Sequence, residues 1–194
     1  MAGLEWYQLA CTRNSSPAFE ELRLYVLSEL LWDCSLSYKD LATDFINAYY
    51  GDAAPEILEY FNLTITTNVK NIDEKNHSQA CTTGYPGNAN FWPFELVFQM
   101  SNILEKAENK IAYLEESKSD EYKVLLNRIR QQKVTVQYLI LSHYRSYYSN
   151  AELLAMIDQM EKTCKQNRIT NVDENEGVGG GLSNLFASWR KELE

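Results

Sequence analysis

Apolar side chains recur every three or four residues along most of this 194-residue chain, and this spacing constrains the fold more than any other feature. Residues at this spacing share one side of an α-helix, and that side must pack against other helices. A looser alternation, which is typical of a strand, is confined to the first dozen residues. The sequence therefore predicts an all-α fold: a multi-helix bundle of about seven helices with a short non-helical N-terminal stub.

Capping residues and glycines indicate where the helices begin and end. Ser16-Pro17 predicts the first start, because a hydroxyl can cap a helix and Pro fits its first position. Ser37, with Asp40 three residues later, predicts the second start as a weak capping box. Later helices are expected after an Asp52 cap, from the Phe91-Trp92 pair, from Ser119 to Tyr147, after an Asn150 cap, and around Leu185 near the C-terminus.

Two polar stretches divide the helical pattern. Residues 71–92 predict a long loop, and loops of that length in compact domains are often functional. Residues 171–181 predict a Gly-rich linker that ends in "GVGGG". A phosphate-binding loop is disfavoured there, because the Lys-Ser/Thr ending of such loops is missing. The expected organisation is a remnant segment at residues 1–15 followed by a helical domain at residues 16–194.

The charge and hydropathy of the chain weigh against two classes of partner. The formal net charge is −9, and the Lys and Arg residues are scattered, so we expect no nucleic-acid surface. No run of apolar residues approaches the roughly 18 that a membrane span needs. The first residues do not resemble a signal peptide, and the four cysteines are too widely spaced to form a C-x-x-C pair. The sequence leaves the cellular compartment undetermined.

Residues for metal binding or covalent catalysis are sparse. The two histidines, His77 and His143, fall in different elements, and His143 is expected to be a hydrogen-bonded structural residue rather than a ligand. There is no G-x-S-x-G motif and no cysteine in an activating context. We therefore expect no metal, no cofactor and no catalytic residue in this chain.

One acidic residue near the N-terminus stands in a different context. Glu5 and Trp6 lie in "GLEWYQL", where an acid is followed by aromatic residues at the end of a short predicted strand. An aromatic ring can stack on a sugar, and a carboxylate can accept hydrogen bonds from hydroxyl groups. From composition alone, an ordinary strand is the favoured interpretation and a sugar-binding strand end is the alternative.

The most information-dense stretch is residues 30–57, which can be interpreted as a site of chemistry or as a corner between helices. The corner is favoured, because its acids sit at helix starts or on polar faces, where capping and the helix dipole explain them. In this interpretation Trp32 and the two tyrosines pack between the helices. Gly51 ends one helix, and Asp52 and Pro55 begin the next. The motif residues are Trp32, Tyr49, Tyr50, Gly51, Asp52 and Pro55.

This stretch also carries a family resemblance. The elements are "LRLY" at 22–25, "LLWD" at 30–33, Phe45 and "YYGDAAP" at 49–55. They resemble a bacterial domain family of unknown function that follows an alpha-glucuronidase-like TIM barrel. The resemblance is specific over residues 19–60 and looser over the following helices.

The resemblance implies that residues 1–15 are the remnant of the last barrel strand, which makes Glu5 and Trp6 candidate substrate contacts in a complete barrel. Most of the barrel, and with it the catalytic acids, is missing from this sequence. The expected function is therefore an accessory domain of a glycoside hydrolase, with the parent protein's TIM barrel as partner. A carbohydrate and a second copy of the chain are further candidate partners. The alternative function is a free-standing helical protein-interaction module.

Overall fold

The computed structural model describes residues 18–75, 89–170 and 181–193, and every regular element in these ranges is helical. This confirms the all-α prediction, whereas the N-terminal stub lies outside the described residues. The α-helices are α1 (Glu20–Trp32), α2 (Tyr38–Tyr50), α3 (Ala54–Lys75), α4 (Phe94–Ile111), α5 (Leu114–Ser117), α6 (Ser119–His143), α7 (Asn150–Asn167) and α8 (Gly181–Leu193). Three short 3₁₀ turns join them: η1 (Gly51–Ala53), η3 (Ala89–Phe91) and η4 (Arg145–Tyr147).

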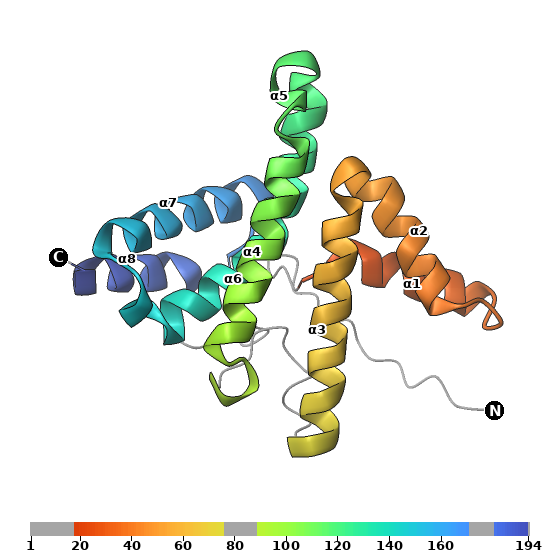
Figure 1. The fold of residues 1–194 in the computed structure, drawn as a ribbon, viewed down its shortest axis with the longest axis horizontal. Helices are drawn as coiled ribbons and strands as arrows, with labels where there is room; N and C mark the ends of the chain where they lie inside the picture. Colours follow the sequence, from red (N-terminus) through yellow and green to blue (C-terminus); the bar gives the residue numbers. More distant parts are fainter. Residues whose placement is uncertain (1–17, 76–88, 171–180, 194) are drawn as a thin grey trace.

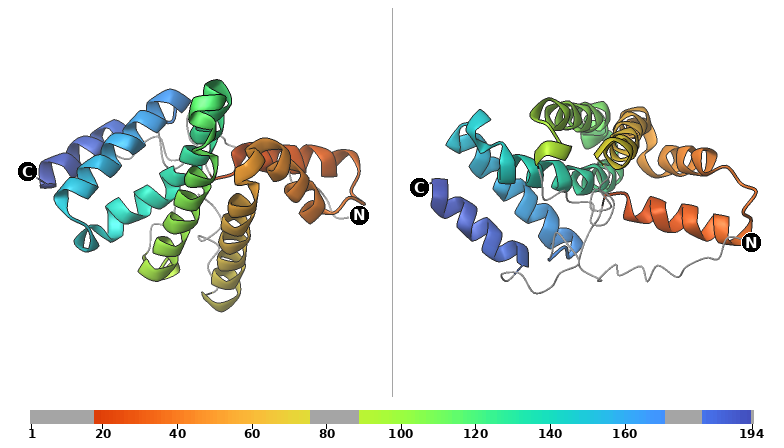
Figure 2. Two further views of the ribbon diagram at one scale, coloured as in Figure 1. Left: turned by 45° about the horizontal axis from the view of Figure 1, so that its top comes forward. Right: turned by 90° about the horizontal axis from the view of Figure 1, so that it is seen from below.

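The helices form an elongated assembly with α6 as its central element. Helices α3 and α4 stand side by side in the middle, α1 and α2 form one end, and α7 and α8 form the other (Figures 1 and 2). Helix α6 packs against both α4 and α7 and also reaches α2. Its middle part, from Gln132 to Gln137, is buried at every position, which is unusual for a helix and fits its central place. Within the described ranges, no helix is long and apolar enough to cross a membrane.

Several helix boundaries differ from the sequence-based expectations. Helix α1 begins at Glu20, later than expected from Ser16-Pro17, and α3 continues to Lys75, into the expected loop. Helix α7 is capped by Ser149 instead of Asn150: Ser149 and Glu152 form a complete capping box. Helix α6 ends at His143, and Tyr147 lies in η4. Ser37 caps α2 as predicted, accepting a hydrogen bond from the Asp40 backbone N–H at 3.4 Å.

The N-terminus of α1 depends on a tertiary contact. Its capping residue is Phe19, in the left-handed region with φ 59° and ψ 37°, and no side chain caps this helix. The Phe19 backbone N–H instead donates to Gln132 Oε1 of α6 at 3.1 Å. The Phe19 ring packs on Tyr60 and Phe61 of α3, with centroid distances of 5.6 and 5.2 Å. Local capping rules missed this start because its partners are distant in sequence.

An ionic cluster joins α4 to α6. Glu108 accepts hydrogen bonds from Arg130 Nε at 3.2 Å and from Lys133 Nζ at 3.0 Å. The Lys133 side chain is only 11% exposed, so its charge depends on Glu108 for compensation. A buried ammonium that loses its partner is strongly destabilising, whereas an exposed ion pair contributes little.

We expect Glu108→Gln to lower the free energy of unfolding by about 2 kcal/mol, because the Lys133 ammonium would remain buried beside a neutral amide. Urea unfolding followed by circular dichroism measures this change. The matched control is Glu116→Gln on α5, an exposed position, which should leave the unfolding midpoint unchanged. Equal midpoints for the two variants would contradict the assigned role of Glu108.

Candidate functional site at the Tyr-Tyr-Gly corner

Gly51 occupies a backbone conformation that other residues avoid. It ends α2 with φ 54° and ψ −129°, and its N–H donates to the Asn47 carbonyl. A Cβ at this position would lie 3.8 Å from Leu125 Cδ1, an ordinary contact distance. Space is therefore available, and the requirement for glycine comes from the positive φ. The prediction that Gly51 closes this helix is confirmed.

Tyr49 is held by a side chain from α6. Arg128 Nη1 donates to the Tyr49 carbonyl at 2.5 Å, and the guanidinium carbon lies 3.7 Å from the Tyr49 ring centroid. The ring also stacks on Phe45, with centroids 4.9 Å apart. Burial, followed by the negative charge of Glu21, raises the pKa of the Tyr49 hydroxyl. The Tyr49 ring is thus already in contact with Arg128 and with Phe45, which indicates a structural role.

Tyr50 is buried and hydrogen-bonded to α6. Its side chain is part of the core, and its hydroxyl accepts a hydrogen bond from Gln132 Nε2 at 3.0 Å. Because the other end of the same amide accepts from the Phe19 N–H, Gln132 connects the start of α1 with the end of α2. Burial raises the pKa of Tyr50 far above its usual range, so this residue stays a neutral phenol.

Asp52 and Pro55 begin the segment that follows the corner. Asp52 lies in η1, and its Oδ2 accepts a hydrogen bond from the Tyr113 hydroxyl, next to α5. That bond, followed by burial, raises the pKa of Tyr113. The sequence predicts that Asp52 caps α3. In the described hydrogen bonds, its carboxylate instead accepts from Tyr113, which is 61 residues away in sequence. Pro55 is the second residue of α3, in the first turn as expected.

Trp32 corrects the sequence-based interpretation of the corner. It was expected to wedge the helices together with the two tyrosines, but its side chain is 92% exposed at the end of α1. Leu22 marks the buried side of α1, and ten residues of helix rotate Trp32 by about 80° from that side. Trp32 is therefore an unburied aromatic residue beside the corner.

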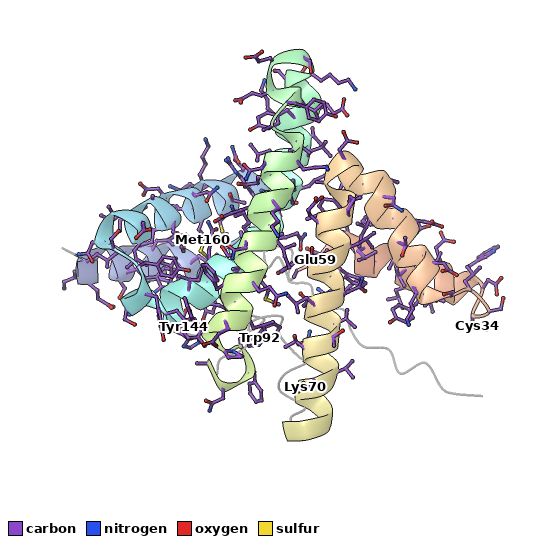
Figure 3. The ribbon with its side chains drawn as sticks, viewed as in Figure 1. Cys34, Glu59, Lys70, Trp92, Tyr144 and Met160 are labelled. Atoms are coloured by element: carbon purple, nitrogen blue, oxygen red, sulfur yellow. The ribbon has the colours of Figure 1, made fainter. Side chains whose placement is uncertain are left out.

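Some of the predicted residues and segments fall outside the described ranges. These are Glu5 and Trp6, the expected strand remnant, and most of the expected linker. The expected loop at 71–92 is described at its two ends only: α3 occupies its first residues, and η3 leads to the buried Trp92. In Figure 3, Trp92 lies beside Tyr144, whose hydroxyl donates to the Trp92 carbonyl at 2.5 Å. Trp92 thus anchors the start of α4.

The described residues hold no group of three or more His, Cys, Asp or Glu side chains placed to bind a metal ion. His143 Nε2 is buried without a hydrogen-bond partner among the described residues, so the expected hydrogen bond is not found at this ring nitrogen. Burial raises the pKa of the Cys164 thiol to about 12, which opposes a nucleophilic role. Cys34 lies exposed at the tip between α1 and α2 (Figure 3).

An open polar groove of about 440 Å³ lies beside Tyr49. Glu21 of α1 and Arg128 of α6 face it, together with a cluster of amides. Asn167 accepts from Asn127 and Gln131 at 2.9 Å each, and donates back to Asn127. These amides largely satisfy one another. The hydrogen bonds among these amides therefore connect α6 to α7 next to the corner. This arrangement indicates a structural role for the groove.

Comparison with known proteins gives one match that covers this corner. The model of a family described as "Domain of unknown function (DUF4838)" matches residues 3–62. No curated protein and no solved structure matches the chain. The matched residues include α1, α2, η1 and the first part of α3, and thus the whole Tyr-Tyr-Gly corner. Over this minority of its length, the chain is similar to a domain of unknown function.

We expect Gly51→Val to lower the free energy of unfolding by about 1 kcal/mol or more, because a β-branched residue would be forced to a positive φ. Gly51→Ala separates strain from size: its Cβ fits beside Leu125, so its loss would come from the backbone conformation alone. Thermal unfolding measures both. An unchanged melting temperature for Gly51→Ala would contradict the backbone explanation.

Replacement of Gln132 should also destabilise the corner. We expect Gln132→Leu to cost about 2 kcal/mol, since the buried Phe19 N–H and Tyr50 hydroxyl would each lose a hydrogen-bond partner. Chemical unfolding measures the change, with the exposed Gln99→Leu on α4 as the control. In Gln132→Leu combined with Tyr50→Phe, the loss should be smaller than the sum of the single losses. Strict additivity would show that the two groups do not interact.

Proposed function

We propose that this chain is an accessory helical domain of a carbohydrate-active glycoside hydrolase. It is not catalytic on its own, and one face of its α1–α2 end packs against the TIM-barrel domain of the parent protein. The chemistry would belong to that barrel. The observation that carries the proposal is a group of large apolar side chains left exposed at this end.

The exposed group defines what we call the α1 face. Its members are Leu24, Leu27, Leu31, Trp32, Leu36 and Tyr38. The three leucines of α1 follow one another at helical spacing, so they share a side of that helix. Leu31 is 56% and Trp32 92% exposed, although both are residue types that folded proteins usually bury. Large apolar residues left exposed on one side of a helix are typical of interaction surfaces.

The sequence of α1 supports the proposal that a further domain packs against this helix. Apolar residues occur all round the helix in "EELRLYVLSELLW", yet Leu22 is its only buried residue. A helix that is apolar on all sides is normally enclosed by other elements. Here α1 packs mainly on α2 at one end of the molecule (Figure 2), and Leu24, Leu27, Leu31 and Trp32 remain exposed. A second packed body on the α1 face would satisfy this pattern.

The barrel is the proposed occupant for two reasons. The α1 face lies within residues 3–62, the part that is similar to the domain of unknown function. The resemblance in the same stretch implies a barrel that ends at residues 1–15, directly before α1. Each residue of an extended chain spans at most about 3.5 Å. A barrel that ends only a few residues before α1 would therefore lie next to this helix in space.

The described carboxylates also fit a non-catalytic role. Four of them have a lowered pKa: Asp33 because it accepts from Ser35, Glu152 because it accepts from Ser149, Glu161 because of Lys165 and Arg190, and Glu192 because of Arg145. A glycosidase general acid needs the opposite shift, to a raised pKa. These side chains stabilise a turn, a cap and helix contacts instead.

Two experiments test the proposal. One is to sequence the DNA upstream of this sequence, and the other is to measure binding between the purified barrel and this purified chain. We expect an in-frame barrel, and we expect the barrel and this chain to bind each other in isothermal titration calorimetry. Leu31→Glu should weaken that binding about tenfold or more, because it places a charge in the apolar contact. Leu154→Glu, an exposed leucine on α7 at the other end, is the matched control and should bind normally.

Activity gives the second readout. Aryl glucuronide and aryl glycoside hydrolysis should be measurable with the barrel and absent with this chain alone. Turnover by this chain that is lost on replacing one of its carboxylates would overturn the proposal. If no barrel is encoded upstream and the α1 face binds another protein, the free-standing interaction module would replace it.

A further inference from the structure

Arg23 lies at the edge of the row of leucines on the α1 face. It precedes Leu27 by four residues on α1, so the two side chains are neighbours on the surface of the helix. Leu24 follows it directly in sequence, and Arg23 is exposed, as are both of these leucines. The α1 face therefore has a cation beside its apolar row.

Arg23 differs from most of the arginines that the structure describes. Its guanidinium forms no hydrogen bond and no ion pair with any described residue, and Arg168, which follows α7, shares this property. The arginines with a partner are Arg128 on Tyr49, Arg130 on Glu108, Arg145 on Glu192, and Arg190 on Asp158 and Glu161. Arg23 is thus available to a partner from outside the described part of the chain.

A domain that covers the α1 face would change the surroundings of Arg23. Packing on Leu24 and Leu27 removes water from the guanidinium beside them. A charged group that loses water without gaining a hydrogen-bond partner is destabilising. The covering surface therefore needs an acceptor at this position, because without one the contact would be weakened there.

We propose that the surface that covers the α1 face carries a carboxylate opposite Arg23. This inference rests on the proposed function, because it names a feature of the barrel that packs there. A carboxylate is complementary in charge to the guanidinium and can accept two parallel N–H donors from it. The chain uses the same pairing between its own helices, where Arg190 of α8 binds Asp158 and Glu161 of α7 at 2.8 and 2.6 Å. The docking surface of the barrel is thus an apolar patch with an acidic residue at its edge.

The test is isothermal titration calorimetry of the purified chain with the purified barrel, at low and at high NaCl concentration. We expect Arg23→Gln to weaken binding about tenfold, because the carboxylate of the barrel would lose its charged partner. Arg23→Lys keeps the charge without the planar fork, so it should weaken binding less than Arg23→Gln does. Added NaCl should weaken the binding of the unmodified chain more than that of Arg23→Gln.

A matched control separates a specific ion pair from general electrostatic attraction. Arg168→Gln removes the same charge from another exposed arginine that has no partner among the described residues, and it should bind like the unmodified chain. Equal weakening in the two variants would overturn the inference. Unchanged binding of Arg23→Gln would also overturn it. Because Arg23 is exposed, its variants should fold, and circular dichroism verifies this.

Leu31→Glu distinguishes a failure of this inference from a failure of the proposed function. If Leu31→Glu prevents binding while Arg23→Gln binds normally, the barrel covers the α1 face without a carboxylate, and only the inference fails. If Leu31→Glu binds normally, or if no barrel is encoded upstream, both fail.

Charge reversal on both sides gives the final check. Exposed acidic residues of the barrel are replaced one at a time by Lys, and each variant is titrated with Arg23→Glu and with the unmodified chain. We expect one barrel variant to bind Arg23→Glu more tightly than the unmodified chain, and the absence of any such variant would overturn the inference.

Discussion

The amide of Gln132 is the contact on which the α1–α2 end of this protein depends. It accepts from the Phe19 backbone at the start of α1 and donates to the Tyr50 hydroxyl at the end of α2. Both partners are buried, so neither can turn to water if the amide is removed. Through this one side chain, the central helix α6 sets where α1 begins and how α2 lies. Arg128, one turn earlier on α6, secures the neighbouring Tyr49 in the same way.

This attachment explains how a helix can present an unburied apolar surface and still have a defined place. Helix α1 is fixed at its N-terminal end by Phe19, whose ring lies in the core, and along one side by α2. Its exposed residues Leu24, Leu27, Leu31 and Trp32 belong to the α1 face. A free helix with that composition would have no reason to keep one orientation, because its apolar residues occur all round it. The fixed orientation makes the face suitable for rigid packing against a neighbouring domain.

The sequence predicted the helical class and much of the corner, because these follow from local rules. Gly51 at the end of α2, Ser37 as a cap and Pro55 in a first turn depend on the conformations and hydrogen bonds of adjacent residues. The misplaced features depend on distant partners. Phe19 caps α1 in a left-handed conformation because Gln132, 113 residues away, holds its N–H. Trp32 and Tyr50 are both aromatic residues near helix ends, and only the packing distinguishes the exposed one from the buried one.

The sequence by itself determined the fold class, the positions of most helices and the need for glycine at the corner, since periodicity and backbone sterics act over a few residues. Only the tertiary structure decided that α6 is the central helix and that the α1 face stays exposed. It also brought Glu108 of α4 into contact with Arg130 and Lys133 of α6. The physical reason is that burial and charge proximity depend on which helix faces meet. That choice is made by the packing of the whole core and not by any single segment.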